Sequence, residues 1–428
     1  MRIFKILLLL IFTTSSFSQE KTKDEKYPEF FGEIMENTAR NIEFWDLDLY
    51  GPLLFVDGET REIYANEPDD KGVLKRVESI FKGTLPNEIN IANTAIDWNG
   101  KRWAMIMLPL PENKHERLDL LSHELFHRSQ PKLGFSIGNP NNDHLDMTNG
   151  RIYLRLELEL LKCALDAEAK DEILKHVTNA ITVRKYRNEI FPGSSSNENL
   201  LELNEGLATY TGIMMSGRNE SEIKEYFEES LFSFKGFPTF VRSFAYLTTP
   251  IYGFVLSRYE KNWNKQINND TNLTDFFISA FNISLPSEIN KSVENIIKEY
   301  EGEKIVAEEL NREEERNKRI AFYKSLFIDK PHLEIKLEKM SISFDPRNII
   351  PIEGYGSVYP SLRVTDNWGI LTVTNGALLG SNWDKIIVSE PLEINEDRIV
   401  GDGWILELKN HYRIEKNESN GNYSLLKK

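Results

Sequence analysis

Two histidines and a glutamate lie together in the short stretch from Ser122 to His127. On an α-helix, residues four apart share one face, so His123 and His127 can hold a single metal ion between them. Glu124 then lies beside that ion, where its carboxylate can accept a proton from a water on the metal. With 7 histidines in 428 residues, this pattern arises by chance in about one such chain in a hundred. The stretch therefore predicts a catalytic metal site.

The element that carries these residues is predicted to be a helix over residues 116–129, because Leu118, Leu121 and Leu125 recur at helical spacing. Two surface histidines on an amphipathic helix are the alternative interpretation. A strand is predicted directly before the helix, at 102–108, and pairs through the turn signal Asn99-Gly100 with a strand over 89–97. A second hairpin is predicted from strands 53–57 and 62–65, and a helix over 73–81.

A second polar stretch, Asn204-Glu205-Gly206-Leu207-Ala208-Thr209-Tyr210, lies further along the chain. Together with H-E-x-x-H it resembles the gluzincin zinc metallopeptidases, the thermolysin-like and zinc-aminopeptidase group. The resemblance covers roughly residues 50–260. It implies that Glu205 is the third zinc ligand, on a second helix. It also implies that Asn204 and Thr209 lie behind the ligands, with the Thr209 hydroxyl supporting a ligand histidine.

The spacing between the second histidine and Glu205 is longer than in the best-known gluzincins, because residues 128–204 intervene. We interpret the excess as an inserted pair of helices within 151–190, followed by a loop at 191–197. Glu157, on this insertion, is the alternative third ligand, and His144 is a rival. The metzincin pattern is excluded because Gln130 and Leu133 replace its glycine and histidine.

A tyrosine or histidine after the third ligand commonly stabilises the oxyanion in gluzincins. Tyr252, near the start of a helix predicted over 251–262, and Tyr246 are the catalytic candidates implied here. His115 and His144 are weaker ones. A strand just before the metal helix is also where thermolysin-like enzymes pair an extended substrate with the sheet edge.

The N-terminus is typical of a secretory signal peptide over residues 1–18. Arg2 and Lys5 precede the apolar run 6–12, and Ser16-Phe17-Ser18 forms a small-x-small cleavage site. The chain is expected to be secreted or periplasmic, with no membrane span after cleavage. Its net charge of −15 argues against nucleic acid as a partner. The single Cys163 excludes an internal disulfide.

The fold class expected is α+β. A thermolysin-like (zincin) catalytic domain with a helical insertion is predicted over residues 19–262, and a charged helical bridging region over 263–330. The pattern then changes to period two, which predicts an all-β domain, a sandwich or barrel, over 331–428.

The sequence predicts an exported zinc metallopeptidase that hydrolyses peptide or protein substrates. Zn²⁺ is bound by His123, His127 and Glu205, and Glu124 is the general base. The lack of a recognisable amine-binding glutamate favours an endopeptidase over an aminopeptidase. The alternatives are a zinc hydrolase of a non-peptide substrate and a non-catalytic binding protein on a metallopeptidase scaffold. A catalytic glutamate beside the metal argues against the latter.

Overall fold

The computed structural model describes residues 23–136, 138, 140–344 and 349–428. The predicted signal peptide at 1–18 lies outside the described residues. The chain divides into two compact units. Unit 1 contains Met1–Gly138, Glu202–Lys224 and Gly253–Leu273, and unit 2 contains Asn139–Leu201, Glu225–Tyr252 and Thr274–Lys428. Each unit takes its residues from three separate segments. The domain boundaries expected at 262 and 330 are not tested by this division and stay a prediction.

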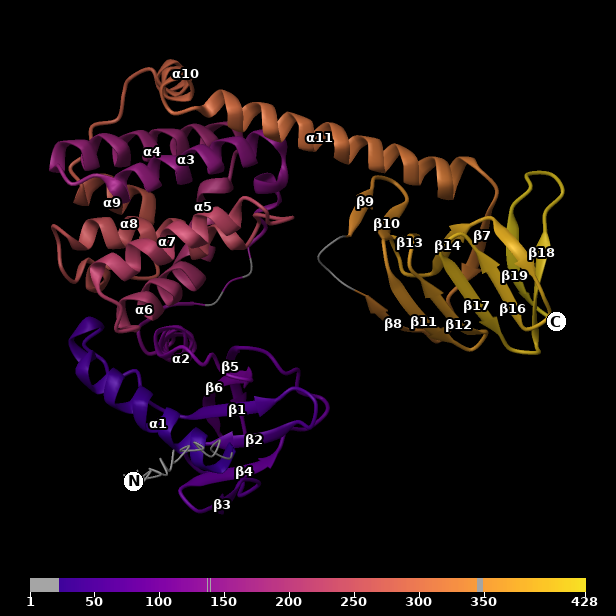
Figure 1. Cartoon of the computed structure of the whole chain (residues 1–428), viewed down its shortest axis with the longest axis horizontal. Coiled ribbons are helices and arrows are strands. Elements are labelled where there is room, and N and C mark those ends of the chain that lie inside the picture. The colour runs from indigo at the N-terminus through magenta and orange to yellow at the C-terminus, as the bar shows by residue number, and fades with distance from the viewer. Residues whose placement is uncertain (1–22, 137, 139, 345–348) are drawn as a thin grey trace, which may run out of the picture. The chain divides into compact units, whose positions relative to one another are not determined.

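A mixed sheet of six described strands forms one side of unit 1 (Figure 1). Its order is β3 (Lys75–Val77), β4 (Ile80–Thr84), β2 (Glu62–Ala65), β1 (Leu53–Asp57), β6 (Lys101–Leu108) and β5 (Thr94–Trp98). Both expected hairpins, β1–β2 and β5–β6, are confirmed. Asn99 and Gly100 have φ angles of 48° and 91°, as a two-residue hairpin turn requires.

Two expectations for this sheet are wrong. Residues 73–81 do not form a helix, since they contribute strand β3 and the start of β4, with Val77 paired to Ile80. Within this segment β3 pairs with β4, from Lys75↔Lys82 to Val77↔Ile80, and β2 pairs with β4 from Phe81 to Thr84. These strand pairings override the local helical preference. Strand β6 is not at the sheet edge either. It lies between β1, to which it is parallel, and β5, which forms the edge.

Helix α2 packs against the β5–β6 side of this sheet and against helix α6. Its start is fixed by Asn113, whose side chain accepts hydrogen bonds from the backbone N–H groups of His115 and Glu116. The expected helix over 116–129 is therefore confirmed, with a start two residues earlier. The described helices that lie within unit 1 are α1 (Lys23–Arg40), η1 (Ile42–Phe44), α2 (Lys114–Ser129), the π-helix η3 (Glu202–Gly206), α6 (Leu207–Met215) and η5 (Trp263–Gln266).

Unit 2 contains the expected helical pair, α3 and α4, which run side by side (Figure 1). The loop expected at 191–197 is shorter than predicted, because helix α5 already begins at Ser194, directly after Gly193 with its φ of 86°. The other described helices, three of which (α7, α8 and α9) cross a unit boundary, are η2 (Asp143–Asp146), α3 (Thr148–Asp166), α4 (Lys170–Ile190), α5 (Ser194–Leu201), α7 (Glu220–Phe234), η4 (Ser243–Tyr246), α8 (Thr248–Ser257), α9 (Leu273–Ala280), α10 (Ile289–Glu299), α11 (Gly302–Lys324) and the π-helix η6 (Ser325–Asp329).

The C-terminal region of unit 2 consists of two sheets. One has the order β18 (Tyr412–Lys416), β19 (Tyr423–Lys427), β7 (His332–Lys336), β14 (Lys385–Ser389), β13 (Ala377–Gly380), β10 (Gly356–Tyr359) and β9 (Ile350–Ile352). The other has the order β15 (Pro391–Ile394), β16 (Arg398–Gly401), β17 (Trp404–Leu408), β12 (Gly369–Val373), β11 (Leu362–Asp366) and β8 (Ser341–Phe344).

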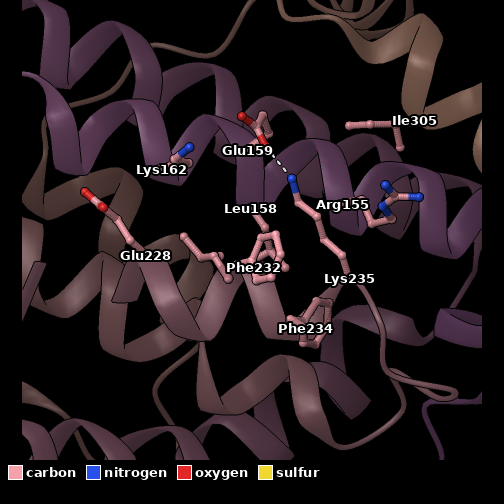
Figure 2. Close-up of a pocket in the computed structure, with 10 residues that line it drawn as sticks. Arg155, Leu158, Glu159, Lys162, Glu228, Phe232, Phe234, Lys235 and Ile305 are labelled. Carbon is pink, nitrogen blue, oxygen red and sulfur yellow. Dashed lines mark ion pairs between the residues drawn. The ribbon is translucent and has the colours of Figure 1, made fainter. Parts of the chain in front are cut away.

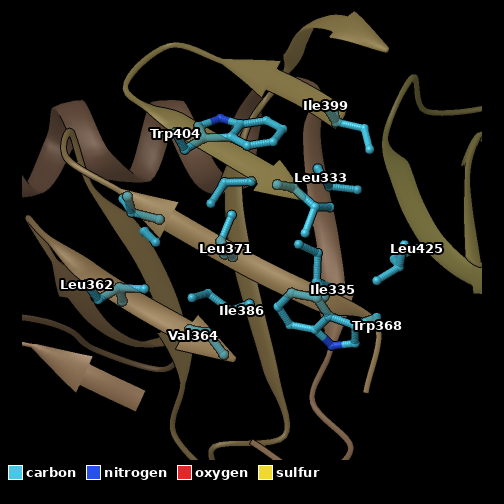
Figure 3. Close-up of a cluster of buried hydrophobic side chains, with 14 of the residues drawn as sticks. Leu333, Ile335, Leu362, Val364, Trp368, Leu371, Ile386, Ile399, Trp404 and Leu425 are labelled. Atoms are coloured by element: carbon cyan, nitrogen blue, oxygen red, sulfur yellow. The ribbon is translucent and has the colours of Figure 1, made fainter. Parts of the chain in front are cut away.

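Side chains from both C-terminal sheets share one hydrophobic core (Figure 3). Leu333 and Ile386 come from the first sheet, and Leu371 and Trp404 from the second. The chain is thus α+β, with a helical part followed by a C-terminal β-sheet region, as expected. No helix in the described part of the chain is long and apolar enough to cross a membrane.

Candidate metal centre

Helix α2 presents His123 and His127 one turn apart. The helix is anchored by its buried face, where Leu118, Leu121 and Leu125 are 3% exposed or less. The two imidazole side chains keep only 14% and 12% of their surface exposed. Their Nε2 atoms lie 3.0 Å apart. Both rings therefore turn the same nitrogen toward one point, as the i, i+4 spacing predicts.

Glu205 brings a third candidate ligand atom to that point. Its Oε2 lies 3.3 Å from Nε2 of His127 and 3.7 Å from Nε2 of His123. The three residues form a group in which all ligand atoms lie within 4.8 Å of one another. Tetrahedral zinc with bonds of about 2.0–2.1 Å separates its ligand atoms by about 3.3 Å. The observed spacings of 3.0 to 3.7 Å therefore fit a small tetrahedral cation.

The segment that carries Glu205 is a π-helical turn, η3, inserted directly before α6. A π-helical turn holds one more residue than an α-helical turn, and such turns are frequent at functional sites. All five residues of η3 are buried. Asn204 lies beside Glu205, with its side-chain Nδ2 3.4 Å from Glu205 Oε1.

Two side chains contact the Nδ1 atoms of the histidines, on the far side of each ring. Nδ1 of His127 lies 2.9 Å from Oε1 of Gln130. Nδ1 of His123 lies 3.5 Å from the hydroxyl oxygen of Thr209, a long contact. The Thr209 hydroxyl donates its own proton to the Glu205 carbonyl at 2.8 Å. It can therefore serve His123 only as an acceptor, the supporting role that the sequence predicts for it.

Glu124 is buried next to the ligands, with 4% of its surface exposed. Its Oε2 has no hydrogen-bond partner among the described residues. Burial raises the pKa of Glu124 to about 7, against the attraction of His127. A buried carboxylate with an unpaired oxygen and a pKa near neutrality is suited to accept and return a proton.

The pKa values of the two histidines shift in opposite directions. Burial lowers the pKa of His123, and the Glu205 carboxylate only partly offsets this. Burial also acts to lower the pKa of His127, but Glu205 and Glu124 together raise it above its ordinary value. The acidic side chains at the site therefore favour positive charge at His127, and a bound cation would satisfy the same electrostatic demand.

The other candidate residues have different partners. The Tyr252 hydroxyl is fully buried and donates to Oε1 of Glu157 at 3.1 Å. Glu157, the alternative ligand, is 0% exposed, and both its oxygens bind arginines, one Arg184 and the other Arg187, at 2.7 Å each. Its carboxylate is thus committed to an ion cluster of unit 2. Tyr246, which ends η4, is 36% exposed.

The weaker histidine candidates are also engaged elsewhere. Nε2 of His144 lies 2.8 Å from Oε1 of Glu198, another member of the same ion cluster. Nδ1 of His115 lies 2.9 Å from the Ser216 carbonyl oxygen, to which it donates. Each histidine therefore has a hydrogen-bond partner that accounts for its position without a metal.

Two features of the centre were missed by sequence reasoning. Gln130 was noted only as a departure from another motif, and the π-helical turn at Glu205 was not anticipated. The spacing of Gln130, one turn after His127, was the available signal, since residues three apart are neighbours on a helix. A π-helical turn has no comparable signal in a single sequence.

A hollow of about 530 Å³ lies elsewhere, in unit 2 (Figure 2). Leu158 and Phe234 contribute apolar side chains, Phe232 is 79% exposed, and Lys235 pairs with Glu159 at 3.6 Å. None of the residues lining this hollow belongs to the candidate metal centre.

Comparisons with models of protein families, with curated proteins and with solved structures found no match. The chemistry of the centre therefore has to be inferred from its own residues.

Proposed function

We propose that this chain is a zinc-dependent metallopeptidase of the gluzincin type, with a thermolysin-like catalytic domain. The observation that supports this most is the convergence of three ligand atoms, from His123, His127 and Glu205, beside the buried carboxylate of Glu124. A structural zinc site would normally have four protein ligands, whereas a catalytic site has three and leaves a position open.

The donor set fits zinc. Two imidazoles and one carboxylate are the protein ligands of several zinc hydrolases, and imidazole nitrogen is a good ligand for this borderline-soft ion. When bound, the ion supplies a Lewis acid and lowers the pKa of a water molecule at the open position.

The residues of the chain supply the remaining chemistry. Glu124 accepts a proton at its unpaired Oε2 and later returns it to the leaving amine. Thr209 and Gln130 hold the histidine rings from behind. The edge strand β5 offers an unpaired row of backbone groups to an extended peptide. The substrate was expected to pair with β6. We now place that pairing at β5, because β5 and not β6 lies at the edge of the sheet.

The same proposal includes export of the chain and a capping or binding role for the C-terminal β region. The export proposal rests on the signal-like residues 1–18. The proposed role of the β region rests on its separate hydrophobic core.

Metal content tests the ligand assignment. We expect about one zinc per purified mature chain by elemental mass spectrometry, and loss of that zinc in Glu205→Ala. Glu157→Ala should keep its zinc wherever it folds, because the Glu157 carboxylate is committed to Arg184 and Arg187. Full zinc in Glu205→Ala together with loss in Glu157→Ala would overturn the assignment.

Hydrolysis of a peptide library tests the reaction. Glu124→Gln should keep its zinc and lower kcat by about 10²–10⁴-fold, the usual contribution of a general base. A panel of small-molecule esters and amides serves as the comparison. Turnover of that panel, with none of the peptides, would replace the peptidase assignment by a zinc hydrolase of another substrate class. Zinc binding without any turnover would favour a binding protein.

A further inference from the structure

Gln130 makes two hydrogen bonds in opposite directions. Its Oε1 lies 2.9 Å from Nδ1 of His127, and its Nε2 donates to the backbone carbonyl of Asn204 at 3.0 Å. The first partner is a candidate ligand on α2, and the second is the residue before the candidate ligand Glu205. One amide therefore bridges the two segments that supply the metal ligands. The Gln130 side chain is 0% exposed, so water does not compete for either bond.

The Asn204 carbonyl decides which way the amide points. A carbonyl oxygen only accepts hydrogen bonds, so the amide must direct its NH₂ group toward Asn204. Its oxygen then faces His127. The reverse orientation would place the amide oxygen against the carbonyl oxygen and leave a buried repulsive contact.

The orientation of the amide decides in turn which nitrogen of His127 carries the proton. Because Oε1 of Gln130 can only accept, Nδ1 of His127 must be protonated to make this contact. In a neutral imidazole, Nε2 then has a lone pair, and this is the nitrogen that faces His123 and Glu205. The backbone of the Glu205 segment thus sets the ligand form of His127.

We propose that Gln130 is a positioning residue of the metal centre, which fixes the tautomer of His127 and holds the Glu205 segment in register with helix α2. The inference rests on the proposed function insofar as that function makes these residues metal ligands. It does not depend on the substrate or on turnover.

The test is zinc affinity, measured by competition with a metallochromic chelator. Gln130→Leu has nearly the same volume but removes both bonds, and we expect it to bind zinc about 10–100-fold more weakly, as for loss of other groups that orient a metal ligand. Gln130→Glu keeps an acceptor for Nδ1–H and loses the donor to Asn204. It should lie between wild type and Gln130→Leu.

Ser129→Ala is the matched control. Ser129 is the neighbouring residue on α2, is 0% exposed, and has a hydroxyl without a partner among the described residues. We expect wild-type zinc affinity in this variant. The absorption spectrum of the cobalt(II) form provides a second readout: it should change in both Gln130 variants and stay unchanged in Ser129→Ala. A merely structural role of Gln130 would leave that spectrum as in wild type.

The outcomes separate this inference from the proposed function. Wild-type zinc affinity and an unchanged cobalt spectrum in Gln130→Leu would overturn the role of Gln130 and leave the peptidase assignment standing. A wild-type protein that binds zinc without hydrolysing peptides would overturn the assignment, while the ranking of the Gln130 variants still tests the bridge. If Gln130→Leu does not fold, wild-type affinity in Gln130→Glu would overturn the bridge to Asn204.

Discussion

The neighbours of a buried side chain decide what its charge can do. Glu124 and Glu157 are both buried glutamates, with 4% and 0% of their surface exposed. Glu124 has an oxygen without a partner in the described structure, whereas both oxygens of Glu157 bind arginines. The same residue type is therefore suited to proton transfer at one position and to structural pairing at the other, because the neighbours differ.

The raised pKa of Glu124 predicts a pH-dependent stability of the metal-free protein. Its pKa is about 7 in the folded state, against 4.5 for an ordinary glutamate, so the folded protein binds more protons between these values. The resulting stabilisation is fully present below pH 4.5 and is lost as pH rises through about 7. It amounts to at most about 3 kcal/mol. Urea unfolding with chelator present measures it.

Glu124→Gln isolates this effect, since glutamine does not titrate. We expect the free energy of unfolding of wild type, minus that of the variant, to decrease between pH 4.5 and about 7. A difference that is constant over this range would show that Glu124 titrates normally.

We expect substitution of Glu157 to lower the free energy of unfolding strongly without loss of bound metal. Glu157→Gln leaves the buried guanidinium groups of Arg184 and Arg187 without the carboxylate that they share. Breaking a buried ion pair in this way costs about 3–5 kcal/mol. Chemical unfolding measures the cost, and zinc content should be unchanged in the folded variant.

Glu159→Gln is the comparison on the same helix. Glu159 is partly exposed and lies 3.6 Å from Lys235, so its loss should cost less than about 1 kcal/mol. Equal effects of the two substitutions would contradict a structural role for the Glu157 cluster.

At the scale of elements, the centre depends on the close packing of α2 against α6. Gly212 of α6 lies at a close contact between these two helices. A Cβ atom at Gly212 would lie 2.7 Å from the backbone oxygen of Asp119 on α2. Only a residue without a side chain fits there, so this glycine permits the close approach of α2, which carries the histidines, to α6, which directly follows the turn with Glu205.

Gly212→Ala should therefore push the two helices apart. We expect a loss of about 1–3 kcal/mol in the free energy of unfolding, typical of overpacking, and a weaker zinc affinity. Gly32→Ala is the matched control, because Gly32 lies in helix α1 and a Cβ atom added there would meet no atom within 4 Å. It should be neutral or stabilising by up to about 1 kcal/mol. Equal stabilities for the two variants would refute the close contact.

At the scale of the whole molecule, the ligands and the C-terminal β region use separate parts of the sequence. The last candidate ligand is residue 205, whereas the shared core of the two C-terminal sheets begins with Leu333. A second apolar cluster joins Phe327 of η6 to Val358 and Leu378 of the first sheet. The β region therefore has a complete core once η6 is included.

A fragment of residues 320–428 should accordingly fold by itself. It contains both sheets together with η6, so it retains both apolar clusters. We expect a cooperative thermal transition and a circular dichroism spectrum dominated by β structure, with no bound zinc. A fragment that lacks a cooperative transition would show that the β region needs the preceding helices for its stability.

The sequence by itself determined the features that depend on near neighbours. The histidine pair on α2 and the Asn99-Gly100 turn follow from helix periodicity and from backbone preferences that act over a few residues. The Asn113 cap is equally local, although the helix was predicted to begin at 116. The change to period two also indicated the C-terminal strands, because alternation reflects a sheet with one buried face.

Only the tertiary structure decided what depends on residues distant in sequence. Strands β3 and β4 replaced an expected helix because they pair with each other and because β4 also pairs with the more distant β2, from Phe81 to Thr84. The bridge from Gln130 to Asn204 and the meeting of Glu205 with the histidines bring together residues more than 70 positions apart. Such contacts depend on how buried polar groups find partners in the packed chain, and a single sequence does not specify those partners.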